Sequence, residues 1–261
     1  MSGKSAIEWC DSTWNPLTGC TRVSPGCDHC YAFALHDARH QLYTENNGLW
    51  RESGKPIPAQ YARPFTDIQL FPQRLHDPLN NKRPTKYFVN SMSDLFHSHV
   101  PLDYILECFE AMRRANWHIF QILTKRGNRL QKLAPAIDWP ENVWMGVSIE
   151  QDKLTARVDQ LRNVAAAIRF LSCEPLLEPL PSLHLEGIGW VITGGESGPN
   201  ARPCHPDWVR HIRDLCLASG VAYLHKQWGG RTPKAGGRLL DGRTWDEYPL
   251  QQRKAAFPPI A

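Results

Sequence analysis

Three cysteines within eleven residues are the feature of this sequence with the clearest chemical potential. Cys20, Cys27 and Cys30 lie in the stretch WNPLTGCTRVSPGCDHCYA with the spacing C-x6-C-x2-C. The close C-x2-C pair suits two thiolates on one metal. A structural zinc ion usually takes four ligands, so Cys10 or a nearby histidine would have to complete the site. Three thiolates without a fourth leave one iron of a 4Fe-4S cluster open, and the spacing favours this cluster over zinc.

The expected cellular setting supports metal ligation over disulfide bonds. The N-terminal stretch MSGKSAIEWCDSTW lacks the apolar core of a signal peptide, and no stretch approaches the ~18 apolar residues that a membrane span requires. We therefore expect a cytoplasmic protein, in which disulfides are rare and clustered cysteines bind metal. The scattered cysteines are interpreted as small buried hydrophobes, with Cys173 also kept as a candidate hydrogen-atom donor.

The composition of the chain indicates a globular protein and leaves its ligand open. Of the 261 residues, 42% are hydrophobic and 21% are charged, which suits one large domain. The formal net charge is +4 and the pI is about 8.6. This modest basicity permits a polyanionic partner without requiring one.

Six apolar runs rich in β-branched and aromatic residues recur along the chain. They do not alternate apolar with polar residues, which predicts parallel strands buried on both faces. The runs are KYFVNSM (86–92), HIFQILT (118–124), VWMGVSI (143–149), IRFLSC (168–173), GWVITGG (189–195) and AYLHKQW (222–228). We expect one further strand at Ile7–Cys10.

Helical patterns lie between these runs. The clearest are Pro101–Ala115, Asp152–Ala167 and His205–Gly220. This alternation predicts an α/β fold, a full or partial (β/α) barrel of about six to seven parallel strands. Residues 1–228 are expected to form the barrel with the three-cysteine loop near its start. Residues 229–261 are expected to form a C-terminal extension packed on the barrel, with a hairpin turn at Asp241 and Gly242.

Polar and ionisable residues follow each predicted strand. In barrel enzymes the functional groups lie on loops after the carboxyl ends of strands, so these residues should meet on one rim and form a site. Glu174, Glu196 and Lys226 follow three successive runs and are expected to converge there. They could move protons or bind substrate, or they could form a structural ion pair.

The chain resembles the phage gene-product thirty-seven/sixty-eight family of uncharacterised proteins in seven motifs that cover nearly all of its length. These are IEWCDSTWNPLTGCTRVSPGCDHCYA, NSMSDLFH, FQILTKR, VWMGVSIE, RFLSCEPLL, WVITGGESGPNARP and HKQWG. That family is commonly grouped with the radical S-adenosylmethionine superfamily. The resemblance implies a barrel of that type, a 4Fe-4S cluster on Cys20, Cys27 and Cys30, and S-adenosylmethionine on the open iron. It also implies an external electron donor of the flavodoxin or ferredoxin type. Cys10, where the family usually has Thr, is not an expected ligand.

The resemblance also implies cofactor contacts by position. Tyr31, directly after the third cysteine, resembles an aromatic residue that packs near the adenine. Asn90, Ser91, Ser93 and Asp94 follow the second strand and are candidates for contact with the methionine amino group. A carboxylate and hydroxyl oxygens suit a protonated amine.

Two later strand ends are further cofactor candidates. Ser148 and Glu150 could reach the ribose hydroxyls of the cofactor. The sequence Gly194-Gly195-Glu196 looks like a motif that the superfamily carries after its second strand, but it follows the sixth run here, so we do not equate the two. We expect its glycines to let the backbone approach a ligand.

The substrate class is the least determined property of the sequence. The phage resemblance, the modest basicity and the cations of the rim favour a nucleic acid or nucleotide, with base modification or lesion repair as the reaction. The alternative is a zinc-stabilised nucleic-acid-binding protein without radical chemistry, supported by the basic stretch LTKRGNR (123–129). A purely structural protein is disfavoured by the polar rim.

Overall fold

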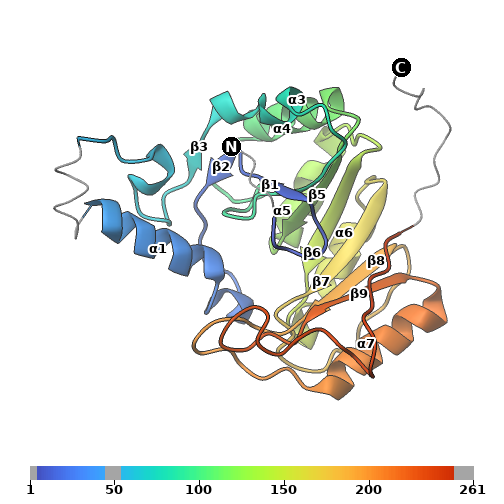
Figure 1. Ribbon diagram of the computed structural model, residues 1–261. Helices are drawn as coiled ribbons and strands as arrows, with labels where there is room; N and C mark the ends of the chain where they lie inside the picture. The colour runs from blue at the N-terminus through green and yellow to red at the C-terminus, as the bar shows by residue number, and fades with distance from the viewer. Residues whose placement is uncertain (1–4, 45–53, 250–261) are drawn as a thin grey trace.

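A curled sheet of seven parallel strands forms the centre of the molecule (Figure 1). The computed structural model describes residues 5–44 and 54–249. The strands, in sheet order, are β1 (Ser12–Trp14), β4 (Lys86–Val89), β5 (Ile119–Thr124), β6 (Val143–Ser148), β7 (Ile168–Cys173), β8 (Trp190–Gly194) and β9 (Ala222–Gln227). Because sheet order follows chain order and every neighbouring pair is parallel, all carboxyl ends meet on one side. The prediction of a full or partial (β/α) barrel of about six to seven parallel strands is confirmed, as a partial barrel of seven strands.

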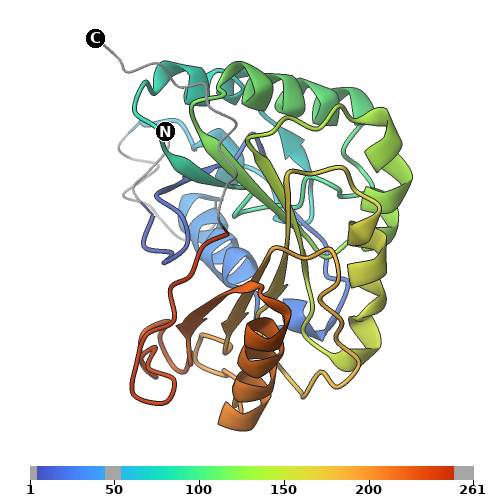
Figure 2. The same cartoon turned by 90° about the vertical axis from the view of Figure 1, so that its right-hand side faces the viewer.

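Helices cover the outer face of this sheet. Figure 2 shows α4, α5, α6 and α7 outside the strands, whereas Figure 1 shows α1 on the opposite side. The helices are α1 (Tyr31–Thr44), α3 (Asp77–Asn80), α4 (Leu102–Arg114), α5 (Gly127–Leu133), α6 (Ala156–Arg162) and α7 (Pro206–Ser219). The connection from β7 to β8, residues 174–189, is fully described and contains no helix. None of the helices in the described part has the length and apolar character needed to cross a bilayer.

Most predicted elements are found close to their expected positions, with two corrections. The strand expected at Ile7–Cys10 is wrong, because β1 begins only at Ser12. The earlier segment is apolar because Trp9 packs inside the barrel, with its ring centroid 4.5 Å from that of Phe88. The helix expected at Asp152–Ala167 is shorter: a 3-10 turn at Asp152–Leu154 precedes α6.

The sheet separates two hydrophobic cores. The larger core lies between the sheet and the outer helices. The inner core fills the barrel below the strand ends with aromatic residues, among them Trp9, Trp144, Phe170 and Trp190. Gly146 on β6 makes room for it, since a Cβ there would lie 2.5 Å from the Phe170 ring. The inner core therefore closes the bottom of the barrel and leaves the space at the strand ends free.

The chain after β9 packs on the edge of the sheet. Asp241 and Gly242 have φ angles of 53° and 81°, and Leu240 pairs with Arg243 across them. Positive φ at both central residues is the geometry of a type I′ turn, so the predicted turn is confirmed. Leu240 and Trp245 join the larger core. The division of the chain at residue 228 stays a prediction, and residues 250–261 lie outside the described part.

Candidate active site

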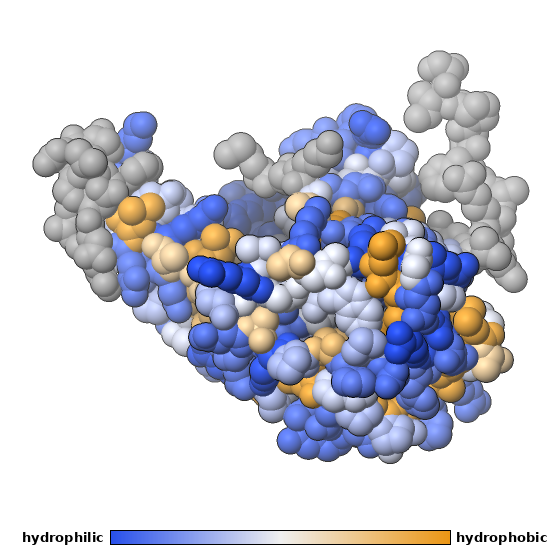
Figure 3. Space-filling model, turned by 60° about the horizontal axis from the view of Figure 1, so that its bottom comes forward, coloured by the Kyte–Doolittle hydropathy of each residue, from blue (hydrophilic) through white to orange (hydrophobic). Residues whose placement is uncertain are grey.

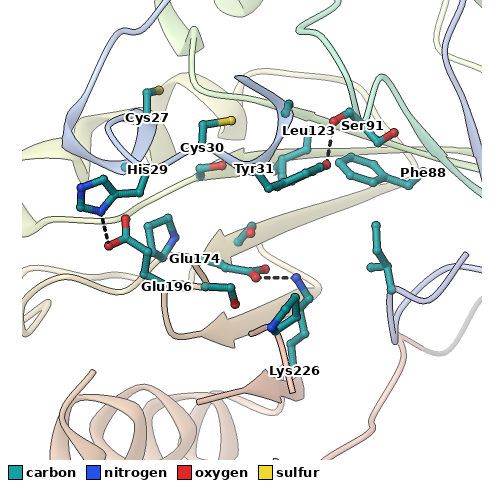
Figure 4. A pocket seen from close by; sticks show the side chains of 18 of the residues that line it. Cys27, His29, Cys30, Tyr31, Phe88, Ser91, Leu123, Glu174, Glu196 and Lys226 are labelled. Atoms are coloured by element: carbon teal, nitrogen blue, oxygen red, sulfur yellow. Dashed lines mark hydrogen bonds and ion pairs between the residues drawn. The ribbon is translucent and has the colours of Figure 1, made fainter. Parts of the chain in front are cut away.

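A cavity of about 670 Å³ lies at the carboxyl ends of the strands (Figure 4). Residues at the ends of β4 to β9 line its wall, together with the segment between β2 (Leu17–Thr18) and α1. The predicted site residues that line it are Cys20, Cys27, Cys30, Tyr31, Asn90, Ser91, Ser93, Asp94, Ser148, Glu174, Glu196 and Lys226. Glu150 is not among the lining residues. The structure thus brings nearly all predicted site residues to one cavity, and their roles stay predictions.

The three clustered cysteines are free thiols on the wall of this cavity. They belong to residues 19–30, which we call the cysteine loop. Cys20 and Cys30 pack against a small hydrophobic cluster that contains Phe33 and Phe65. Cys27 is buried, and it ends a short 3-10 turn that starts at Pro25. Cys10 and Cys173 are also buried but do not line the cavity.

The environment of Cys20 favours its neutral form until a cation arrives. Burial raises the pKa of Cys20 to about 12, and the charge of Asp94 and the neighbouring thiolates of Cys27 and Cys30 add to the rise. The Arg126 guanidinium opposes it in part. A cationic group bound between the three thiols would reverse the shift, as metals do for coordinating thiols.

The described part of the chain contains no preformed site for a single metal ion. Zinc binds sulfur at about 2.3 Å, so tetrahedral ligands must lie roughly 4 Å from one another. Within residues 5–44 and 54–249, no group of three His, Cys, Asp or Glu side chains has an arrangement that could hold one metal ion. The histidines near the cysteines have other partners: His29 contacts Glu196 and His36 contacts the Gln60 carbonyl. Neither histidine is therefore placed as a fourth ligand beside the cysteines, and the identity of the metal stays a prediction.

Arg126, which follows β5, is the first anchor of the cysteine loop. Its Nη2 donates to the Thr21 carbonyl at 3.0 Å and to Thr21 Oγ1 at 2.9 Å. Its Nη1 lies 3.2 Å from Asp94 Oδ2 and 4.0 Å from Cys20 Sγ. The Asp94 carboxylate also accepts a hydrogen bond from Thr124 Oγ1 at 2.7 Å. An ammonium group that bound Asp94 would therefore have to share this carboxylate with Arg126.

Glu150 is a second anchor and lies behind the cavity wall. Its carboxylate accepts hydrogen bonds from Ser24 Oγ and from Arg157 Nη1, the latter at 2.8 Å, and Lys125 Nζ lies 3.4 Å away. Burial alone would raise the pKa of Glu150, but Lys125, Arg157 and Ser24 outweigh it and lower the pKa. A Cβ on Gly26 would lie 2.7 Å from this carboxylate, so the glycine permits the close approach. Glu150 therefore holds the cysteine loop, and its expected contact with the ribose stays a prediction.

Glu196 and Arg202 form a third anchor. Arg202 Nε and Nη2 donate to the two carboxylate oxygens of Glu196 at 2.9 and 2.5 Å, and His29 Nδ1 donates to Oε2 at 2.9 Å (Figure 4). Arg202 Nη2 also donates to the Pro25 carbonyl at 2.7 Å, and its Nη1 lies 3.4 Å from Asp28. Burial would raise the pKa of Glu196, but the hydrogen bonds from Arg202 and His29 lower it to about 2.

Glu174 and Lys226 form a separate ion pair. The Lys226 ammonium lies 2.5 Å from Glu174 Oε1, and both side chains are partly exposed to the cavity. The pair spans the end of β8, which lies between β7 and β9. Gly194 on β8 lies beside the crossing side chain, since a Cβ there would lie 3.2 Å from Glu174 Cδ. Glu196 does not share in this pair, so the three ionisable groups expected to converge are divided between two arrangements.

The basic stretch 123–129 is occupied by internal contacts. Lys125 pairs with Glu150, and Arg126 holds the cysteine loop. Arg129 donates from Nη2 to the Val100 carbonyl at 2.6 Å. These three cations therefore position neighbouring segments, and the nucleic-acid-binding alternative that rested on them stays a prediction.

The hydroxyl candidates near β4 also have protein partners. Ser93 Oγ donates to the Leu17 carbonyl at 3.0 Å, and Ser91 Oγ lies 3.2 Å from Asn15 Oδ1. Tyr31 donates from its hydroxyl to the Ser91 carbonyl at 2.6 Å, which places its ring along the cavity (Figure 4). These residues line the site, and their hydrogen bonds fix the wall against which a ligand would rest.

Asn90 differs from these neighbours because its amide has no partner. The residue is 3% exposed and lines the cavity, yet neither Nδ2 nor Oδ1 forms a hydrogen bond within the described structure. Its φ of 63° is left-handed, which asparagine tolerates better than most residues. A buried amide without partners is costly, so a bound ligand that satisfies it would be favoured.

The glycines before Glu196 serve packing between loops. A Cβ on Gly195 would lie 2.0 Å from the Trp228 carbonyl oxygen. The backbone after β8 therefore passes directly against the chain after β9. We expected these glycines to let the backbone approach a ligand. At Gly195 the backbone instead approaches the carbonyl group of Trp228.

Sequence reasoning missed the residues that hold the cysteine loop. Arg202 and Arg157 were not singled out, and Arg126 was interpreted only as a member of the polar rim and of a basic stretch. The available signal was weak: Arg157 and Arg202 each lie within ten residues of a strand end that is followed by a carboxylate, Glu150 or Glu196. His97 was missed too, and its Nε2 lies 2.9 Å from Thr21 Oγ1.

Comparisons with known proteins give a family. A family model described as a protein of unknown function, DUF5131, matches residues 4–249. It carries no information on the expected phage association. A search of the curated proteins found no match.

Solved structures of spore photoproduct lyase have a broadly similar arrangement. A double mutant with bound AdoMet and dinucleoside spore photoproduct is 11% identical with a TM-score of 0.49. The lyase complexed with dinucleoside spore photoproduct is 13% identical with a TM-score of 0.45. Each comparison covers 82% of this chain and 63% of the lyase, so the chain spans less than two thirds of the lyase's length. Similarity at this level carries no conclusion about activity.

Proposed function

The chain belongs to the DUF5131 family, whose function is unknown, and we propose that it is a radical S-adenosylmethionine enzyme with a 4Fe-4S cluster on Cys20, Cys27 and Cys30. The observation that carries the proposal is the placement of three free thiols on one cavity at the carboxyl ends of seven parallel strands. Three thiolates leave one iron for a small molecule. The cavity beside them has room for one, since ligand sites of several hundred cubic ångströms are common.

The residues present fit these cofactors in two respects. The pKa of Cys20 is raised to about 12, which a cationic cluster would correct, and the loop that carries the thiols is anchored from several strands. Asn90 offers an unsatisfied amide on the same cavity. When bound, the reduced cluster would supply the electron that splits S-adenosylmethionine into methionine and a 5′-deoxyadenosyl radical, and that radical would remove a hydrogen atom from the substrate.

The chain's own residues then bind and orient the ligands. Tyr31 provides an aromatic wall for the adenine, and Ser148 is available for the ribose. Asn90 and Asp94 lie at the position for the methionine amino group, with Asp94 shared with Arg126. Ser91 and Ser93 shape this wall through their own hydrogen bonds.

We assign the substrate end of the cavity to Glu174 and Lys226. This pair can bind a polar substrate group or exchange a proton with it, because both side chains reach the cavity while remaining largely buried. We further propose a nucleic acid or nucleotide as the substrate, with base modification or lesion repair as the reaction. The aromatic lining, which includes Trp9 and Phe88, supports this class because bases stack on aromatic rings. A reduced flavodoxin or ferredoxin would supply the electron.

A cofactor-cleavage assay tests the proposal. Anaerobically reconstituted, dithionite-reduced protein is incubated with S-adenosylmethionine, and 5′-deoxyadenosine and methionine are measured by mass spectrometry. We expect slow release of both products without substrate, and faster release when the correct DNA, RNA or nucleotide is added. An intact cluster with neither cofactor binding nor cleavage would reject the radical reaction. Acceleration by an extract freed of nucleic acids and nucleotides would keep the reaction and reject the substrate class.

A further inference from the structure

Two residues after β8 hold the part of the cysteine loop that lies on either side of Cys27. Arg202 binds the Pro25 carbonyl and lies 3.4 Å from the Asp28 carboxylate. Glu196 binds both Arg202 and His29. The contacts therefore reach the loop before Cys27 and again just before Cys30. They add to the direct backbone hydrogen bond from Cys30 N–H to the Cys27 carbonyl at 3.4 Å.

Four donors contact the Glu196 carboxylate, three of them at Oε2. Oε1 accepts from Arg202 Nη2, and Oε2 accepts from Arg202 Nε, from the Arg202 backbone N–H at 2.9 Å and from His29. The Glu196 side chain is only 5% exposed. A carboxylate with four donors in place has little capacity left for a substrate. This arrangement argues against a catalytic role for Glu196 and for a role inside the protein.

The contacts of Arg202 differ from those of an arginine on the surface. Arg210 on α7 pairs with Asp207 and Asp241, and all three side chains are well exposed. Exposed pairs of this kind contribute little to stability. The contacts of Arg202 with Glu196 are bidentate and partly buried, which makes them stronger and more specific in geometry.

We propose that Glu196 and Arg202 act as a latch that positions the cysteine loop for ligation, so that Cys27 and Cys30 are held ready before any cluster is present. The functional meaning of the latch rests on the cluster proposed above. Its structural effect does not, since the contacts exist in the protein alone. Arg202 and Glu196 are positioning residues in this account, and they act on the cluster only through the loop.

The test measures how readily individual cysteines react in the folded, metal-free protein. Wild type, Arg202→Gln, Arg202→Lys and Glu196→Gln are treated with iodoacetamide under native, reducing conditions, and modification of each cysteine is followed by mass spectrometry. Arg210→Gln is the matched control. Cys173 and Cys216, both completely buried in the core, report on global unfolding within the same sample.

We expect Cys27 to react about ten- to hundredfold faster in Arg202→Gln than in wild type, the size expected for losing charge-assisted hydrogen bonds. The rate of Cys27 modification in Arg202→Lys should lie between the rates in wild type and in Arg202→Gln, because lysine keeps the charge but cannot make the bidentate contact. Cys173 and Cys216 should stay protected in every variant. Arg210→Gln should match wild type.

Two results would overturn the latch. One is a Cys27 rate in Arg202→Gln within twofold of wild type. The other is an equal rise at Cys173 and Cys216, which would mean that the substitution loosens the whole fold. A second readout is loss of iron to a chelator, which should be faster in Arg202→Gln than in Arg210→Gln. If wild type assembles no cluster, the proposed function fails on that measurement while the alkylation rates still decide the latch.

Discussion

Lys226 donates a hydrogen bond to Glu174 across the end of β8, with 2.5 Å between Nζ and Oε1. The pair belongs to the cavity but not to the anchors of the cysteine loop. This separation gives the two carboxylates of the rim, Glu174 and Glu196, different tasks. Substitutions in the Glu174–Lys226 pair and substitutions in the anchors of the cysteine loop should therefore impair different measured properties.

Lys226→Met should impair substrate turnover and spare the cluster. Methionine keeps the length of the side chain but removes the ammonium, which leaves the Glu174 carboxylate without its partner. We expect iron content and substrate-free cofactor cleavage within about twofold of wild type, and at least a hundredfold loss of substrate-stimulated cleavage, about 3 kcal/mol in barrier. Loss of the substrate-free cleavage would place Lys226 at the cofactor.

Asp94→Asn should destabilise the fold more than loss of an exposed pair does. Its ion pair with Arg126 is nearly buried, and truncating one partner of such a pair costs roughly 3 kcal/mol because the other charge is left buried. Asp138→Asn, which breaks an exposed contact with Arg113, is the control and should cost less than about 1 kcal/mol. Urea unfolding measures both, and equal losses would contradict the buried pair's role.

Asn90→Gly should leave stability almost unchanged while weakening cofactor binding. Glycine adopts the φ of 63° freely, and removing an unsatisfied buried amide offsets the entropy that glycine adds to the unfolded chain. We expect a change below about 1 kcal/mol in unfolding free energy and roughly tenfold weaker binding of S-adenosylmethionine. Asn142→Gly is the control, since the Asn142 amide donates to three carbonyl groups and its loss should destabilise the fold. A large loss of stability in Asn90→Gly with unchanged binding of S-adenosylmethionine would contradict the assignment of Asn90 to the cofactor site.

Ionisation of Glu196 should make the free energy of unfolding depend on pH. Its pKa is lowered from 4.5 to about 2, so its ionised form is stabilised in the folded state. The contribution, about 3 kcal/mol at most, is complete above pH 4.5 and is lost as the pH falls toward 2. Urea unfolding at pH 6 and pH 3 should show a smaller loss for Glu196→Gln than for wild type. Parallel losses in the two proteins would show that the carboxylate contributes nothing.

The sheet could be predicted from the sequence because its strands are buried on both faces. Runs such as 143–149 and 168–173 are continuously apolar, and parallel strands place their carboxyl ends together, so the rim followed from the pattern. Ile7–Cys10 was misread because Trp9 is apolar for another reason, namely that it fills the barrel interior.

The anchors of the cysteine loop could not be predicted in the same way. Arg202 binds the Pro25 carbonyl, a residue 177 positions away, and a local pattern carries no trace of such a contact. The same holds for Glu150 and Ser24. The side chains expected to meet a substrate do lie on the rim. Which of them instead contact other parts of the protein depends on the folded cysteine loop and could not be predicted from the sequence.

The cluster itself is tested most directly by counting iron and sulfide. The protein is reconstituted anaerobically as wild type and with Cys20→Ala, Cys27→Ala or Cys30→Ala, with Cys10→Ala and Cys108→Ala as controls. We predict about four iron and four sulfide per chain in wild type and in both controls, and loss of the cluster in each of the three loop variants. Stoichiometric, tightly bound zinc after iron-rich anaerobic expression, or a full cluster in any of the three loop variants, would contradict the account.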